Sequence, residues 1–139
     1  MGAYVRPGSF MRSTNWLVKR LGVTPVLVVR GRRTAHGQEV PVNVLVQDNT
    51  RYLVSTRGET QWVRNLRAAT GFAELHTKKG VEPIAATEVP DDVKPAIIDG
   101  YRKKWGRRTS AQWKALPDPA DHPVFEIRPT IVSPTTPQQ

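Results

Sequence analysis

The arginine residues of this sequence gather in two groups that suit the binding of an anion. One group contains Arg32 and Arg33, and the other begins at Arg57. A guanidinium group carries a planar fork of N–H donors that matches phosphate and carboxylate groups. The two groups together predict a site for a molecule with several negative charges. The arginines concerned are Arg30, Arg32, Arg33, Arg57, Arg64 and Arg67.

The second group lies directly before a predicted helix. The run Arg57-Gly58-Glu59-Thr60 precedes that helix, and the free backbone N–H groups at a helix start attract an anion. Gly58 also lets a ligand approach the backbone closely. The alternative is a solvated basic face, with Trp62 and Leu66 of the helix simply packed in the core.

Other kinds of chemistry lack a signature. Cysteine is absent, which excludes disulfides, thiolate metal sites and a cysteine nucleophile. There is no P-loop, no Gly-rich dinucleotide fingerprint and no Gly-x-Ser-x-Gly elbow. The histidines match no ligand spacing, so we expect no metal, and each is interpreted as a surface or packed imidazole: His36, His76 and His122. If the protein is an enzyme, the reactive atoms belong to a bound cofactor.

Hydrophobic periodicity predicts a mixed α+β fold. We expect helices over 10–21, 59–69 and 93–105 and a short one around Trp113, and strands over 24–30, 39–47, 51–56, 72–77, 81–89 and 123–128. The first three strands are predicted to form an antiparallel meander with a tight turn at Asp48-Asn49-Thr50. So few strands avoid exposed edges by closing into a small barrel.

The chain is long enough for one domain, with 139 residues. We expect an N-terminal segment over 1–22, a barrel over 23–129 and a flexible tail over 130–139. The sequence shows no secretory signal and no apolar stretch of membrane-spanning length, so a cytoplasmic location is expected. The net charge of +9 favours an anionic partner. The helix over 10–21 is predicted to cover the barrel; its basic, amphipathic character makes peripheral membrane association the alternative.

Several of these segments resemble one family. They are Val29-Arg30-Gly31-Arg32-Arg33-Thr34, Val40-Pro41-Val42-Asn43, Arg51-Tyr52-Leu53-Val54-Ser55, the run from Arg57 to Arg67, and His122-Pro123-Val124-Phe125-Glu126-Ile127. The sequence over about 12–129 is similar to the deazaflavin-dependent nitroreductase family. The Gly-Glu-Thr-Gln-Trp-Val-Arg-Asn-Leu-Arg run is the most specific part of this resemblance.

The resemblance implies a split β-barrel that binds the deazaflavin coenzyme F-420, whose tail carries several negative charges. Its implied reaction is hydride transfer from reduced F-420 to an organic acceptor such as a quinone, a nitro compound or an activated alkene.

The resemblance also implies which residues serve the site. Arg32, Arg33 and Thr34 are expected at the coenzyme's tail or phosphate. Arg57, Gly58 and Arg64, with the start of the Trp62 helix, are expected at the phosphate and the ring edge. Ser55 or Thr56 is expected near the ring. Tyr101 is expected to line the acceptor pocket, and the proton is expected from water or from Tyr101.

One departure and several alternatives accompany this interpretation. Glu39 stands where the family has a basic residue, which bears on the preferred length of the coenzyme tail. The nearest rival is a split barrel that uses FMN. A second rival is a nucleic-acid-binding module built on the basic run 103–108, which we interpret instead as a solvated helix end, so no nucleic acid is expected as a partner. A homodimer is possible.

Overall fold

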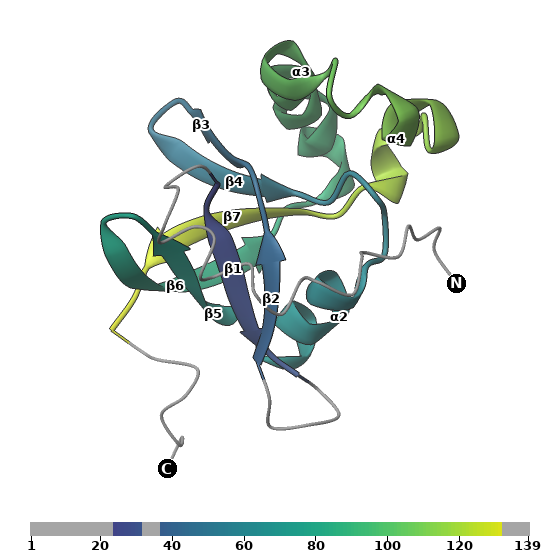
Figure 1. Cartoon of the computed structure of the whole chain (residues 1–139). Helices are drawn as coiled ribbons and strands as arrows, with labels where there is room; N and C mark the ends of the chain where they lie inside the picture. Colours follow the sequence, from purple (N-terminus) through teal and green to yellow (C-terminus); the bar gives the residue numbers. More distant parts are fainter. Residues whose placement is uncertain (1–23, 32–36, 132–139) are drawn as a thin grey trace.

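The described part of the chain, residues 24–31 and 37–131 of the computed structural model, folds around one curled sheet (Figure 1). The strands are β1 (Val26–Arg30), β2 (Gly37–Pro41), β3 (Val44–Gln47), β4 (Thr50–Val54), β5 (Phe72–Thr77), β6 (Gly80–Glu88) and β7 (Val124–Pro129). The helices are α2 (Gln61–Ala68), α3 (Lys94–Trp105) and α4 (Ser110–Ala115), with 3-10 turns η2 (Asp91–Val93) and η3 (Pro119–Asp121).

The order of the strands explains the curl of the sheet. The order is β2-β1-β5-β6-β7-β4-β3, and every neighbouring pair is antiparallel. β2 and β3 therefore lie at opposite edges, yet only Val42 and Asn43 separate them in the chain. Such a short connection is possible only if the sheet bends until its two edges meet. This geometry confirms the predicted α+β split barrel.

The prediction of one strand over 39–47, and of a three-stranded meander, is wrong. The segment forms two strands because residues up to Pro41 pair with β1, whereas residues from Val44 pair with β4. The Val42 N–H still donates to the Pro25 carbonyl at 3.0 Å, in register with the β1–β2 ladder. Pro41, which has no N–H to donate, lies on an edge strand, as is usual for proline in sheets. The tight turn between β3 and β4 is confirmed, since Asp48 and Asn49 both have positive φ, at 53° and 62°.

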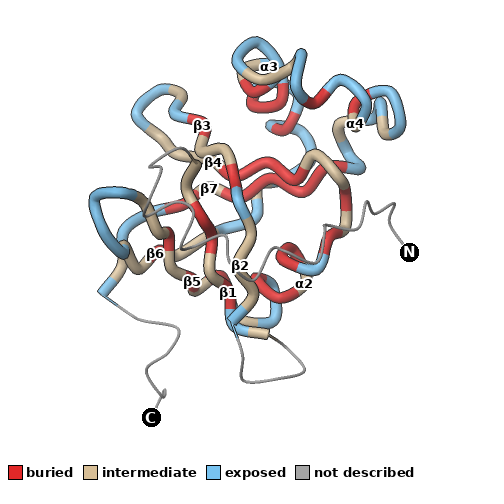
Figure 2. The backbone as a smooth tube through the Cα atoms, in the orientation of Figure 1, coloured by how far each residue is buried: buried red, intermediate tan, exposed pale blue. Residues whose placement is uncertain are grey.

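Two hydrophobic cores lie on opposite faces of β4 and β7. Successive residues of a strand point to opposite faces, and Leu53 and Phe125 belong to the core beneath α2. Their neighbours Val54 and Val124 belong to the core beneath α3 and α4. Figure 2 shows buried backbone along both strands, between α2 on one side and α3 and α4 on the other. The two strands therefore connect the barrel interior to the α3–α4 lobe.

The helix α2 is stopped by Gly71, as the sequence predicts. The Gly71 N–H donates to the Leu66 carbonyl at 2.9 Å, and Gly71 has a φ of 89°. A Cβ at this position would overlap the carbonyl of Ala86 on β6. Only glycine therefore satisfies both the backbone conformation and the close approach of β6.

The helices of the second lobe agree with the prediction, with one refinement. The expected helix over 93–105 begins with the 3-10 turn η2 before α3, and Trp113 lies on α4. The predicted helix over 10–21, the residues Arg32, Arg33 and Thr34, and most of the predicted tail lie outside the described residues. No helix among the described residues is both long and apolar enough to cross a bilayer.

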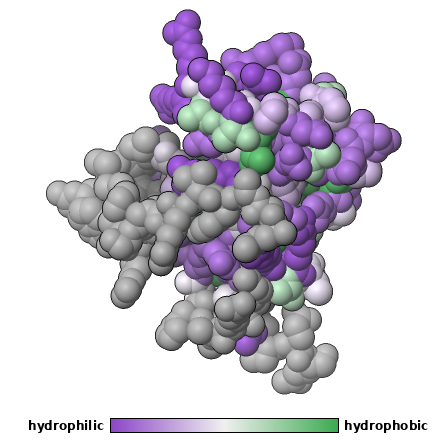
Figure 3. Space-filling model, turned by 90° about the vertical axis from the view of Figure 1, so that its right-hand side faces the viewer, coloured by the Kyte–Doolittle hydropathy of each residue, from purple (hydrophilic) through white to green (hydrophobic). Residues whose placement is uncertain are grey.

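The basic run that suggested nucleic acid lies at the end of α3 and just beyond it. Lys103 pairs with Asp99 at 3.2 Å, and the Lys104 ammonium lies over the Trp105 ring at 4.8 Å. Where described residues are visible, the face in Figure 3 is mostly hydrophilic with small apolar areas. This face therefore presents mainly polar groups to solvent.

Candidate functional site

The loop over 55–60, between β4 and α2, is held by hydrogen bonds on both the hydroxyl and the backbone of Ser55. The Ser55 hydroxyl donates to the Gly58 carbonyl at 2.6 Å, and its N–H donates to the Pro123 carbonyl at 2.9 Å. Its side chain is buried, with 2% exposed. Ser55 therefore shapes the loop, whereas the resemblance places Ser55 or Thr56 near the coenzyme ring.

Gly58 and Thr60 turn this loop into the start of α2. Gly58 has a φ of 83°, a conformation that favours glycine, and its carbonyl accepts a second hydrogen bond from the Thr60 N–H at 2.9 Å. Thr60 is the N-cap of α2, but its side chain makes no capping hydrogen bond. Threonine in this position usually accepts a hydrogen bond from the first turn.

The Thr60 hydroxyl differs from the other polar groups described in this loop, because nothing in the described residues bonds to it. It is buried and has no hydrogen-bond partner among the described residues, in a residue that is 6% exposed. A buried hydroxyl without a partner costs free energy, and it lies beside backbone N–H groups that a helix start leaves without partners in its own helix. The loop and the first turn of α2 thus offer donors suited to a phosphate oxygen.

Two of the predicted arginines are available to such an anion. Arg57, in the loop, and Arg64, in the second turn of α2, are each half-buried. Neither forms an ion pair with a carboxylate within the described residues. Their charges are therefore not neutralised by the described part of the chain.

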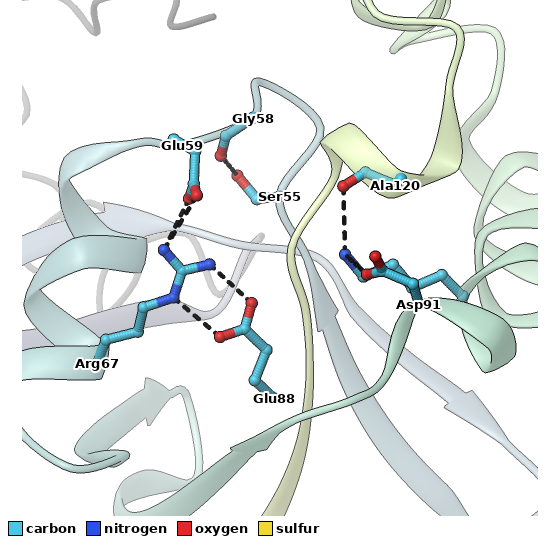
Figure 4. A network of polar contacts seen from close by, with 8 residues as sticks. Ser55, Gly58, Glu59, Arg67, Glu88, Asp91 and Ala120 are labelled. Atoms are coloured by element: carbon cyan, nitrogen blue, oxygen red, sulfur yellow. Dashed lines mark hydrogen bonds and ion pairs between the residues drawn. The ribbon is translucent and has the colours of Figure 1, made fainter. Parts of the chain in front are cut away.

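Arg67, another member of the predicted arginine group, is used for structure instead. Figure 4 shows its guanidinium between two carboxylates, Glu59 before α2 and Glu88 at the end of β6. The closest N–O distances are 2.9 Å to Glu59 and 2.7 Å to Glu88. The hydrogen bonds with Glu88 are the main reason that the pKa of Arg67 is raised above its ordinary value. This arginine ties the start of α2 to β6.

The β1–β2 hairpin approaches the same helix. The Asn65 side chain on α2 donates to the side-chain oxygen of Gln38 on β2 at 2.7 Å. Gln38 lies shortly after the segment 32–36, which contains the other predicted arginines and lies outside the described residues. The described part of the β1–β2 hairpin therefore contacts α2 through Gln38.

Trp62 lies in the first turn of α2, but its side chain belongs to the core. It is 7% exposed, and its ring centroid lies 6.0 Å from that of Phe125 on β7. This placement matches the alternative in which Trp62 simply packs the core. A ligand at the helix start meets the backbone N–H of Trp62 rather than its ring.

Tyr101 lies in the second core, under α3 and α4. It is 3% exposed, and its hydroxyl accepts a hydrogen bond of 3.0 Å from the Asn43 side chain. Burial raises the pKa of this phenol, and the hydrogen bond from Asn43 opposes that effect. Because the Asn43 amide donates, the Tyr101 proton remains available to another acceptor.

Comparison with protein families identifies the family of this chain. Residues 8–116 match the model of the F420H2-dependent quinone reductases. The chain belongs to that family. The protein is therefore an oxidoreductase that carries out F-420-dependent reduction, as the resemblance implied. No curated protein matches the sequence significantly.

Solved structures confirm the fold of this F420H2-dependent quinone reductase. An F420-H2 dependent reductase named FDR-A has a TM-score of 0.53 at 14% identity, over 75% of this chain and 92% of its own. A putative pyridoxamine 5'-phosphate oxidase from Listeria innocua has a TM-score of 0.55 at 15% identity, over 84% and 91%. A protein described as a domain-swapped dimer has a TM-score of 0.56 at 12% identity, over 84% and 95%.

Sequence reasoning missed two side chains of this reductase that the structure brings to notice. Thr60 carries the unpartnered hydroxyl, and a threonine directly before a helix is a recognisable N-cap signal. Asn43 contacts the Tyr101 hydroxyl from 58 residues away, so no local pattern reveals it. Among the described residues, no group of three or more potential metal ligands gathers.

Proposed function

We propose that the 55–60 loop and the first turn of α2 hold the phosphate of F-420. The observation that supports this is the Thr60 hydroxyl, which is buried at a helix N-terminus and has no partner within the described residues. A phosphate oxygen there gains a hydroxyl donor, backbone N–H groups and the helix dipole together. Gly58 forms the turn before the helix with a φ of 83°, and Arg57 adds a cation from the same loop.

The charged tail of the coenzyme extends from this point toward the β1–β2 hairpin. Arg64 lies one turn along α2, and the Asn65–Gln38 hydrogen bond brings the hairpin to that helix. Arg32, Arg33 and Thr34 lie outside the described residues, and we propose, from the family resemblance, that they supply further contacts to the tail. The carboxylates of the tail match guanidinium groups through paired hydrogen bonds.

The protein's own part in the reaction is binding and positioning. When bound, reduced F-420 supplies the hydride. The loop fixes the coenzyme through its phosphate, and the α3–α4 lobe forms the acceptor side with Tyr101. Because Asn43 donates to the Tyr101 oxygen, the phenol is oriented to give its proton to the reduced acceptor. The acceptor is a quinone or a related small organic molecule.

Titration with F-420, followed by tryptophan fluorescence, tests the site. Thr60→Val keeps the shape of the side chain and removes the hydroxyl, and Arg57→Ala removes the cation. Each change is expected to weaken F-420 binding by roughly one to two orders of magnitude, since a hydrogen bond to a charged group contributes about 1.5 to 3 kcal/mol. Lys103→Ala, in the solvated run on α3, is the control with unchanged affinity.

FMN and NADPH are titrated beside F-420 to test the coenzyme itself. Both are expected to bind much more weakly than F-420. Equal or tighter binding of FMN overturns the choice of coenzyme. Wild-type affinity in both Thr60→Val and Arg57→Ala places the phosphate elsewhere.

We also propose that the protein forms a homodimer. Support comes from the domain-swapped dimer of the same fold. Light scattering coupled to size exclusion measures the mass in solution, and a monomer at micromolar concentration contradicts the proposal.

A further inference from the structure

The imidazole of His122 bridges two parts of the fold that serve different sides of the proposed site. Its Nδ1 lies 2.9 Å from the carbonyl oxygen of Ser55, in the loop that precedes α2. Its Nε2 lies 2.6 Å from the carbonyl oxygen of Leu116, where α4 ends. The ring is fully buried, with no exposed surface.

Both of these oxygens can only accept a hydrogen bond. A neutral imidazole has one N–H donor and one acceptor nitrogen, whereas the imidazolium has two donors. The observed contacts can therefore both be hydrogen bonds only when the ring carries two protons. In the neutral ring, one nitrogen lone pair faces a carbonyl oxygen at the same short distance and is repelled by it.

The ring packs against an aromatic side chain and lies among elements that carry charged groups of both signs. The Trp113 ring on α4 lies against it, with centroids 4.3 Å apart, and aromatic faces attract cations. Among the described residues, no carboxylate bonds to the ring. Charged groups of both signs lie on the neighbouring elements. They are Arg57 and Glu59 in the loop, Lys114 on α4, Asp118 and Asp121 around η3, Arg102 over Trp113, and Lys94. Lys94 is buried and is paired with Asp91 at 2.9 Å.

We propose that His122 is a positioning residue that, in its doubly protonated form, ties the coenzyme loop to the α4 side of the site. This inference rests on the proposed function, which assigns the 55–60 loop to the coenzyme phosphate. Ser55 connects His122 to the rest of the loop. Its carbonyl oxygen contacts the His122 ring, and its hydroxyl donates to the Gly58 carbonyl. Loss of one ring proton releases either the loop or the end of α4.

The direct test is nuclear magnetic resonance of the protein labelled with nitrogen-15 at histidine. Both ring nitrogens of His122 are expected to carry slowly exchanging protons in the folded protein. A ring that holds a single proton overturns the proposal.

The second arm measures F-420 affinity in two variants. His122→Gln carries both side-chain N–H bonds on one nitrogen, so it cannot bridge Ser55 and Leu116. This variant is expected to bind F-420 about fivefold more weakly than the wild type. His76→Gln, at a half-buried histidine that contacts Glu74 on β5, is the matched control and is expected to retain wild-type affinity.

The two arms separate the possible failures. If the wild type does not bind F-420 at any pH, the proposed function is wrong, and the resonance experiment still decides whether His122 is the bridge. If His122→Gln folds and binds F-420 as tightly as the wild type, the bridge does not serve the coenzyme and the proposal fails. A poorly folded His122→Gln leaves the wild-type resonance data as the deciding measurement.

Discussion

The hydroxyl of Ser55 donates a 2.6 Å hydrogen bond to the carbonyl of Gly58, three residues further along the loop. This contact helps to fix the left-handed turn at Gly58, two residues before the N-cap of α2. Ser55→Ala is expected to cost about 1 kcal/mol of stability and to weaken F-420 binding several-fold by loosening the loop. Thermal unfolding and F-420 titration measure the two effects. If the variant is destabilised but binds F-420 with unchanged affinity, this hydrogen bond does not contribute to coenzyme binding.

Arg67 connects the start of α2 to β6 through Glu59 and Glu88, which predicts a contribution to stability that depends on salt. The three side chains are about one third exposed, so solvent screens their attraction. Arg67→Met is expected to lower the free energy of unfolding by about 0.5 to 1 kcal/mol at low salt and by less at high salt. Denaturant unfolding at two salt concentrations checks this. An equal loss at both concentrations attributes the effect to packing.

Tyr101→Phe tests the proposed proton donor. It is expected to lower kcat while leaving F-420 affinity unchanged, because the hydroxyl contacts Asn43, outside the 55–60 loop that we propose as the phosphate site. Steady-state kinetics with a quinone acceptor measures kcat. An unchanged kcat assigns the proton to water and leaves Tyr101 as a packing residue.

Burial of Tyr101 also predicts an alkaline effect on stability. Its pKa in the folded protein is raised above that in the unfolded chain, so folding favours the protonated phenol. This contribution is complete below the unfolded pKa and is lost as the pH rises through the folded pKa. Melting temperatures between about pH 8 and about pH 11 are expected to fall less steeply in Tyr101→Phe than in the wild type.

Two glycines with positive φ provide a matched pair for a stability measurement. Gly71 has a φ of 89° and faces the Ala86 carbonyl, whereas Gly80 has a φ of 128° and open space where a Cβ would lie. Gly71→Ala is expected to destabilise the protein by more than about 1 kcal/mol, because strain and overlap add. Gly80→Ala carries only the backbone strain. Equal melting temperatures for the two variants contradict the importance of the β6 contact.

Local patterns predict most elements of the fold but not the arrangement of β2 and β3. The turn at Asp48-Asn49 and the end of α2 before Gly71 are set by backbone chemistry within a few residues. Both can therefore be predicted from the sequence. The division of the strand over 39–47 depends on which partners its two halves find at opposite edges of the sheet. That information lies in contacts between distant residues.

The site shows the same division between local and distant information. Arg57, Gly58 and the helix start are recognisable because they adjoin in the sequence. The roles of Arg64 and Arg67 cannot be distinguished in the sequence, because Glu88 comes close to Arg67 only in the folded chain. The interpretation of His122 as a packed imidazole agrees with its burial, but its two carbonyl contacts depend on segments 67 and 6 residues away.

The position of β7 has a consequence for how the protein is made. This strand is among the last described residues to be synthesised, yet it lies between β4 and β6, with Leu53 opposite Phe125 and Thr87 opposite Glu126. Until it leaves the ribosome, β4 and β6 each have an open edge, and open edges invite pairing with other chains. The nascent reductase is thus most exposed to aggregation immediately before this strand emerges, when chaperones have most to protect.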